Sequence, residues 1–276
     1  MAKKITLRTI VAILAAAWTV IAFAPFVFMV LNSFKAKFEL FTGGVFALPN
    51  ELRWANYYEV ITRGTFFRYV LNSVTVVGAA LVLTLAASAF AAYPLSRFKF
   101  RLRGVYNLII LAGMAIPLHV TLIPVFLMSK RIGVYDSLWA LIGPYVAFNI
   151  PMSAFILTGF MQGIPGEIEE AAEIDGCSRV RTFFKMILPL SVPGMATLAI
   201  YNSAIMWNEF SFALVLTQSV SNRTLPLSIW EYQGQYSADI PMIMTVLMLS
   251  ALPVILAFVV GQEKLIKGMM AGAVKG

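Results

Sequence analysis

The feature that most constrains this chain is a series of apolar runs, each about as long as a membrane is thick. Residues 10–31 are apolar almost without a break, and a helix needs about 20 such residues to cross the hydrocarbon core of a bilayer. The chain is 60% hydrophobic and 12% charged, whereas about 25% of the residues in a soluble domain are charged. These properties predict an all-α integral membrane protein.

Six apolar runs follow one another, and each predicts a transmembrane helix. Their approximate ranges are 10–32, 68–93, 104–128, 138–160, 192–217 and 241–261. The third run contains Pro117 and Pro124, which predict a kinked or broken helix because proline removes a backbone donor. We expect residues 1–276 to form a single transmembrane domain.

The basic residues indicate how the chain crosses the membrane. Four of them lie within seven residues that contain no acid, namely Arg97, Lys99, Arg101 and Arg103. Cytoplasmic loops carry an excess of Lys and Arg, so the N-terminus, residues 163–190 and the C-terminal tail 262–276 are predicted to be cytoplasmic. The net charge of +8 therefore reflects topology and contact with membrane lipid, and does not indicate nucleic-acid binding.

Several kinds of chemistry are excluded by composition. The one cysteine, Cys177, excludes an internal disulfide and a CxxC motif, and the one histidine, His119, excludes a multi-histidine zinc site. No GxxxxGK[ST] sequence occurs, so the chain has no P-loop. We expect no catalytic residue, metal or cofactor on this chain, and we expect His119 to be a packed or interfacial side chain.

An acidic segment, residues 163–190, interrupts the apolar pattern between the fourth and fifth runs. It holds five of the 13 acidic residues, Glu167, Glu169, Glu170, Glu173 and Asp175. Glu and Ala favour a helix over 167–173. Asp175-Gly176 predicts the end of that helix, with the glycine in the left-handed conformation, and Ser178 can cap a second helix. The sequence therefore predicts a helix-turn-helix along the membrane surface.

The second of these helices is predicted to carry one apolar face and to end at its prolines. The residues concerned are Val180, Phe183, Phe184 and Ile187 for the face, and Pro189 and Pro193 for the end. The pattern leaves two interpretations open. The segment is either a docking element, where Ala171 and Ala172 allow close approach and the glutamates meet basic residues of a partner, or a solvated loop that returns the chain to the membrane.

The segment from Glu169 to Pro193 resembles the EAA signature of ABC-importer permeases. That signature combines Glu-Ala-Ala, a glycine four residues later, and an ending similar to Ile-x-Leu-Pro. The matching residues are Glu170, Ala171, Ala172, Gly176, Ile187, Leu188 and Pro189. Cys177 departs from the small residue, commonly alanine, that usually follows the glycine.

Further stretches resemble the carbohydrate-uptake branch of these permeases, and the smaller permeases of maltose and glycerol-3-phosphate importers most closely. They are Asn72-Ser73, YPLSRFKFR from Tyr93, Ile116-Pro117, Trp207 to Phe210, and the ending from Gln262 to Gly276. The resemblance implies a bacterial or archaeal plasma (inner) membrane protein that helps to import a sugar, a polyol or an oligosaccharide.

The resemblance also implies partners. ATP and Mg would bind to a separate ABC ATPase dimer, whose closure moves the cytoplasmic loop and switches a pair of permeases between inward and outward access. A second, homologous permease and an extracytoplasmic solute-binding protein would complete the importer. The implied ATPase-coupling residues are Glu169, Glu170, Ala171, Ala172, Asp175, Gly176, Phe183 and Pro189.

Glu209 is the one acidic residue within a predicted span, and such groups usually face a cavity or a partner side chain. The hypothesis for the substrate path therefore combines it with nearby polar and aromatic residues, giving Asn149, Asn202, Trp207, Asn208 and Glu209. A helix–helix hydrogen bond is the alternative. For the whole chain, the alternatives are an ion-coupled secondary transporter or channel, and a membrane enzyme or scaffold.

Overall fold

The computed structural model describes residues 2–234 and 237–273, and nearly all of its regular structure is helical. The elements are, in order, α1 (Ala2–Ser33), α2 (Glu39–Gly43), α3 (Ala55–Thr62), α4 (Phe66–Arg97), α5 (Arg103–Ala115), η1 (Leu118–Thr121), α6 (Leu122–Arg131), α7 (Trp139–Gln162), α8 (Glu167–Ile174), α9 (Arg179–Thr182), η2 (Phe183–Ile187), α10 (Leu188–Leu190), α11 (Val192–Trp207), α12 (Ser211–Leu216), η3 (Val220–Asn222), η4 (Leu225–Tyr232) and α13 (Ile240–Ala273).

Four helices are long and apolar enough to cross a membrane by themselves, in the ranges Arg8–Ser33, Phe66–Arg97, Trp139–Gln162 and Ile240–Gln262. Two further pairs pass the same test together but are bent at a short break, namely Arg103–Ala115 with Leu118–Arg131, and Arg179–Leu190 with Val192–Trp207. The described residues therefore contain four candidate spans, or up to six if each bent pair is one span.

The third predicted span is broken where its first proline lies. α5 ends at Ala115, η1 begins at Leu118, and the two parts are bent by 90°. Ile116 and Pro117 between them are extended, since a residue before proline is pushed out of the helical region. Pro124 lies in the first turn of α6, where a missing N–H costs no helical hydrogen bond.

The fifth predicted span, 192–217, is wrong as a single helix. α11 ends at Trp207, and the helix restarts only at Ser211 as α12. The carboxylate of Glu209 accepts hydrogen bonds from the backbone N–H groups of Phe212 and Ala213. A side chain that binds backbone donors in this way competes with helix continuation, and an apolar run gives no sign of it.

The chain divides into two compact units, one formed by residues 1–67 and 228–252 and the other by 68–227 and 253–276. In the first unit, the Ser33 carbonyl accepts hydrogen bonds from the Asn56 amide (2.8 Å) and the Thr245 hydroxyl (3.0 Å). A small apolar core packs beside them, with Val60 and Val246 each 1% exposed. These contacts join α3 to the ends of α1 and α13.

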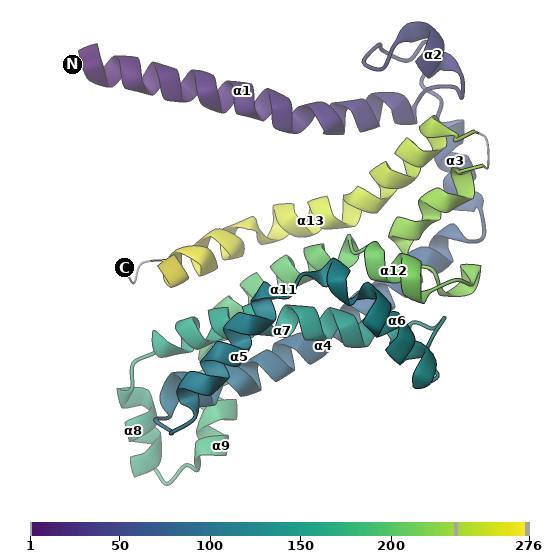
Figure 1. The fold of residues 1–276 in the computed structure, drawn as a ribbon. Coiled ribbons are helices and arrows are strands. Elements are labelled where there is room, and N and C mark those ends of the chain that lie inside the picture. The colour runs from purple at the N-terminus through teal and green to yellow at the C-terminus, as the bar shows by residue number, and fades with distance from the viewer. Residues whose placement is uncertain (1, 235–236, 274–276) are drawn as a thin grey trace. The chain divides into compact units, whose positions relative to one another are not determined.

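In the second unit, α4, α5, α7 and α11 run beside one another, and α8 and α9 lie at one end of them (Figure 1). Two apolar cores hold this arrangement. One contains Leu141, Phe212 and Leu216, and the other contains Leu157, Phe183 and Leu198. The second core lies at the α8–α9 end, so the acidic segment is attached to the bundle by buried apolar side chains.

Asp136, in the loop between α6 and α7, binds the segment that follows α12. Its carboxylate accepts hydrogen bonds from the backbone of Gln218 (2.8 Å) and Ser219 (2.9 Å) and from the Ser219 hydroxyl. Burial alone would raise the pKa of Asp136, but these hydrogen bonds and one from Asn222 outweigh it, and the pKa lies below its usual value. The ionised carboxylate therefore stabilises the fold.

We expect Asp136→Asn to lower the free energy of unfolding by about 1–3 kcal/mol at neutral pH, because one of its two acceptor oxygens is lost. Asparagine tolerates the positive φ of 56° at this position, so backbone strain is not added. Because the folded-state pKa is depressed, the stabilisation is complete above the unfolded-state pKa and disappears as the pH falls through the folded-state pKa. Thermal unfolding in detergent should show the difference at pH 7 and lose it in acid.

Candidate functional site

The acidic segment folds as two short helices separated by a tight turn. α8 carries three glutamates in its first turn, where the helix dipole favours negative charge. Gly176 has a φ of +73°, and the N–H of Cys177 reaches back to the carbonyl of Ala172 (2.8 Å), which closes the α8 C-terminus. The Ser178 side chain accepts a hydrogen bond from the backbone of Arg181 and caps α9.

The predicted apolar face of the second helix is divided. Phe183 and Ile187 are buried in the chain's own core (4% and 0% exposed), whereas Val180 and Phe184 are exposed (68% and 49%). Residues 183–187 wind as a π-helix, whose extra residue per turn shifts the register away from the 3.6-residue period. Pro189 does not end the helix as predicted, because α10 continues to Leu190.

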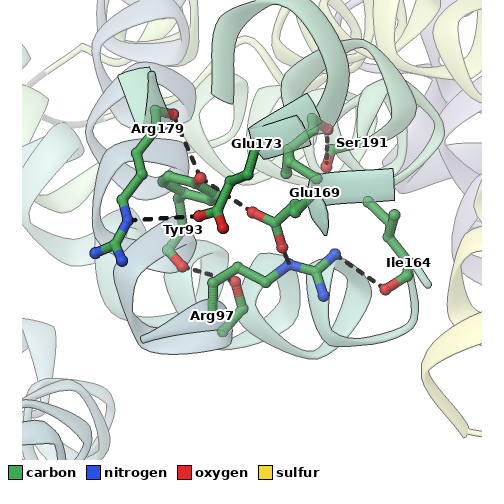
Figure 2. Close-up of polar contacts among 9 residues, drawn as sticks. Tyr93, Arg97, Ile164, Glu169, Glu173, Arg179 and Ser191 are labelled. Carbon is green, nitrogen blue, oxygen red and sulfur yellow. Dashed lines mark hydrogen bonds and ion pairs between the residues drawn. The ribbon is translucent and has the colours of Figure 1, made fainter. Parts of the chain in front are cut away.

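One glutamate of α8 is bound by side chains from the end of α4 (Figure 2). The Oε2 atom of Glu169 lies 2.9 Å from Nε of Arg97, and the Tyr93 hydroxyl donates to Oε1 at 3.0 Å. Nη2 of Arg97 also donates to the carbonyl of Ile164 at 3.0 Å. The side chains of Arg97 and Glu169 are only 11% and 20% exposed, so this ion pair is largely shielded from water.

The neighbouring coupling candidates divide into buried and exposed residues. Glu170, Ala171 and Asp175 are exposed, whereas Ala172 is fully buried within the chain. Beside α8 lies a groove of about 320 Å³, lined by Glu170 and by other residues that include Tyr93, Arg97, Glu169, Glu173 and Arg179. Of the eight coupling candidates, Glu169 and Glu170 line this groove, whereas Ala172 and Phe183 are buried within the chain.

The five path candidates are not gathered in one place. Asn149 and Glu209 line a cavity of about 220 Å³, and Trp207 and Asn208 line a groove of about 630 Å³ between α11 and the second half of α13. Asn202 lines neither, because it is fully buried and its amide donates to the Ser153 hydroxyl at 2.8 Å.

Glu209 forms a hydrogen bond to helix α7, which is the alternative to a role in the substrate path. In addition to its two backbone hydrogen bonds, its Oε2 atom accepts a hydrogen bond from the Tyr145 hydroxyl at 2.8 Å. It therefore joins the break between α11 and α12 to α7. His119 lies beside this junction, with Nε2 3.3 Å from the Ser211 hydroxyl.

Sequence reasoning missed two kinds of residue. Tyr201 is 42% exposed and lines both the groove and the cavity, and its spacing with Ile205 and Asn208 (i, i+4, i+7) on one helix face was the available signal. Tyr93 and Arg97 were noticed only as part of the YPLSRFKFR stretch, and Arg97 also as one of four basic residues. Nothing local in the sequence indicates that they bind Glu169.

Among residues 2–234 and 237–273, no three His, Cys, Asp or Glu side chains are grouped so as to hold a metal ion.

The sequence matches known transport proteins over most of its length. The family described as binding-protein-dependent transport system inner membrane component matches residues 84–262. A putative ABC transporter permease protein of a Caldicellulosiruptor species is 53% identical over 264 residues, which cover 96% of each chain. The trehalose/maltose transport system permease protein of Thermococcus litoralis is 31% identical over 281 residues, which cover 100% of both chains.

The fold matches as well. A chain in the crystal structure of a bacterial ABC transporter involved in the import of the acidic polysaccharide alginate has a TM-score of 0.80 and 22% identity, with 95% of this chain and 98% of that chain covered. With the family match and the long relatives, the membrane-spanning helices place the protein in a membrane as a multi-pass transport component. The chain therefore belongs to the family of inner membrane components of binding-protein-dependent transport systems, the permease subunits of ABC importers.

Proposed function

We propose that this chain is the permease subunit of an ATP-driven carbohydrate importer and forms half of its translocation path. The observation that carries the proposal is the full-length match to a trehalose/maltose permease, together with a more similar relative that is itself named an ABC transporter permease. The names of other relatives, which act on diacetylchitobiose and starch degradation products, point to the same substrate class.

The α8–α9 segment, residues 163–190, is proposed to couple the permease to an ABC ATPase. It presents an exposed acidic and small-residue surface, formed by Glu170, Ala171, Glu173 and Asp175, at one end of the helical bundle. Basic residues of an ATPase groove would complement this charge. ATP and Mg would be bound and consumed on that separate subunit, and the permease itself would do no chemistry.

The membrane arrangement follows from the same proposal. Six spans are formed by α1, α4, α5 with α6, α7, α11 with α12, and α13. The N-terminus, residues 163–190 and the tail 262–276 face the cytoplasm, since the basic residues gather on that side. α13 continues to Ala273, while residues 274–276 of the tail lie outside the described residues.

The proposed partners are a second, homologous permease and an extracytoplasmic solute-binding protein, as the family description of binding-protein-dependent transport suggests. The sugar path would use the groove lined by Tyr201, Trp207 and Asn208. Aromatic faces and amides are suited to sugars, which combine apolar ring faces with hydroxyl groups that hydrogen-bond.

Transport in proteoliposomes tests the proposal. The permease pair, the ATPase and the binding protein are reconstituted together, and uptake of maltose, trehalose and chitobiose is measured with ATP inside the vesicles. We expect uptake of at least one of these sugars to require ATP and the binding protein and to persist when an uncoupler removes the ion gradient. Uptake that stops with the uncoupler and ignores ATP would instead identify an ion-coupled transporter.

A further inference from the structure

Two adjacent glutamates of α8 face different surroundings. Glu170 is exposed, whereas the side chain of Glu169 is only 20% exposed. Both carboxylate oxygens of Glu169 are occupied within the chain, Oε2 by Arg97 and Oε1 by Tyr93 (Figure 2). Both oxygens of Glu169 are therefore already engaged within the chain, whereas Glu170 is exposed to solvent.

The end of α4 holds the acidic segment at two points before and within α8. Arg97 binds the carbonyl of Ile164, which precedes α8, as well as the carboxylate of Glu169 in its first turn. Because one guanidinium bridges both positions, α8 cannot move away from Arg97 without breaking the ion pair to Glu169 and the hydrogen bond to Ile164. Charge-assisted contacts of this kind are stronger than neutral hydrogen bonds.

The other side of the segment is fixed to the same end of α4 by aromatic packing. The rings of Tyr93 and Phe183 are 4.9 Å apart, and Phe98 lies 5.3 Å from Tyr93. The guanidinium of Arg179 sits 5.0 Å above the Phe98 ring. Both arms of the α8–α9 segment are therefore attached to the last turn of α4 and the residue that follows it.

The opposite end of α4 is attached to a different segment. The Asn72 amide donates to the carbonyls of Ser221 and Arg223, each at 2.8 Å, and the Ser73 hydroxyl accepts from the backbone of Leu225 at 2.8 Å. α4 is one continuous helix over Phe66–Arg97, so Asn72 and Arg97 are separated by about 37 Å along its axis. All of these residues belong to the second unit.

We propose that α4, as one continuous helix, transmits movement of the α8–α9 segment to residues 221–225 at its far end. In this proposal the Arg97–Glu169 ion pair, together with Tyr93, attaches α4 to the segment. Glu169 and Arg97 are positioning residues in this scheme, while Glu170 faces the ATPase. The inference rests on the proposed coupling function. ATPase binding and uptake per ATP should therefore be separable by mutation, because the Arg97–Glu169 contact lies within the chain whereas the docking surface is exposed.

The experiment uses the complete importer in proteoliposomes and measures three quantities: ATPase bound to the purified permease, ATP hydrolysed, and sugar taken up. Arg97→Gln and Glu169→Gln are compared with the exchange that combines Arg97→Glu with Glu169→Arg. We expect both single variants to keep the bound ATPase, and the uptake per ATP hydrolysed to fall on the order of tenfold, a typical strength of coupling between sites. The exchange restores the ion pair but not the hydrogen bond to the Ile164 carbonyl, because a carboxylate cannot donate. It should therefore recover part of the lost uptake per ATP.

A matched control and a distant variant complete the design. Arg101→Gln removes an exposed basic residue from the loop that follows α4 and should leave uptake per ATP unchanged. Asn72→Ala removes two of the three hydrogen bonds described at the far end of α4 and should lower uptake per ATP without affecting the bound ATPase. Because Asn72 is distant from the α8–α9 segment, misfolding of that segment cannot explain its effect.

The proposal is overturned if both single variants transport normally, or if Asn72→Ala transports normally. It is also overturned if Glu169→Gln loses the ATPase to the same extent as it loses uptake, because Glu169 would then be a docking residue. A wild-type permease that binds no ATPase would instead contradict the coupling function itself, so the two failures are distinguishable.

Discussion

Glu170→Lys is expected to remove most of the ATPase that co-purifies with the permease. Glu170 is exposed beside the groove at the α8–α9 end, and under the proposed function it pairs with a basic residue of the ATPase. Disrupting a charge pair that is buried in an interface costs about 2–5 kcal/mol, and each 1.4 kcal/mol weakens binding about tenfold. The bound ATPase, measured by quantitative gel after purification in detergent, should therefore fall by more than about tenfold.

The structure provides a matched control for this substitution. Glu51→Lys makes the same change of charge at an exposed residue of the first unit, and it should leave the bound ATPase unchanged. Membrane insertion of both variants should be normal, because neither side chain is packed inside the chain. Equal ATPase binding by Glu170→Lys, Glu51→Lys and the wild type would contradict the assignment of the α8–α9 segment as the docking surface.

The choice of Glu170 over its neighbours comes from the structure. Ala172 is fully buried, so Ala172→Arg would disrupt the attachment of α8 to the bundle and could not report on docking alone. Ala171 is exposed, and Ala171→Arg adds bulk at the surface without that complication. Ala171→Arg should therefore reduce ATPase binding, as Glu170→Lys does.

The sequence predicted the helices better than it predicted their interruptions. Apolar runs gave the positions of α1, α4, α7 and α13, since a membrane requires length and hydrophobicity in one continuous stretch. Pro117 indicated the break after α5, because proline acts locally on the backbone. The break after α11 depends on where the Glu209 carboxylate points, and that is decided by Tyr145, 64 residues away in the sequence.

In the candidate site, too, features set by neighbouring residues were predictable, whereas contacts between distant residues were not. The left-handed turn at Gly176 and the cap at Ser178 were predictable, because each depends on neighbouring residues. The separate roles of Glu169 and Glu170 were not, because the partner of Glu169 is the Tyr93 hydroxyl, 76 residues away. Sequence pattern thus located the segment that we propose for docking, but it could not divide that segment into inward-facing and outward-facing parts.

Glu209→Ala is expected to have the largest effect on the stability of the permease. The substitution leaves the backbone N–H groups of Phe212 and Ala213 without their acceptor, and both residues are almost fully buried (1% and 0% exposed). An unsatisfied buried donor costs about 1–3 kcal/mol. For a chain of this length, the temperature of unfolding in detergent should fall by roughly 5–10 °C, and uptake should be lost with it.

Two gentler variants separate the contributions. Tyr145→Phe removes one hydrogen bond to Glu209 and leaves both backbone donors satisfied, so its unfolding temperature should lie between those of the wild type and Glu209→Ala. Glu209→Gln keeps one acceptor oxygen but places an amide donor opposite other donors. Its unfolding temperature should therefore be closer to that of Glu209→Ala than the unfolding temperature of Tyr145→Phe is. The unfolding temperatures of the three variants, measured under one set of conditions, check this order.

The same series decides whether Glu209 is a path residue. A side chain that binds the sugar would raise the KM for uptake when changed to glutamine and leave the unfolding temperature unaltered. The three hydrogen bonds to Glu209 engage both of its oxygens, so the protein itself uses most of the capacity of this carboxylate to accept hydrogen bonds. We therefore expect the unfolding temperature to change first, and the KM effect to appear in variants of Tyr201, whose side chain borders both the groove and the cavity.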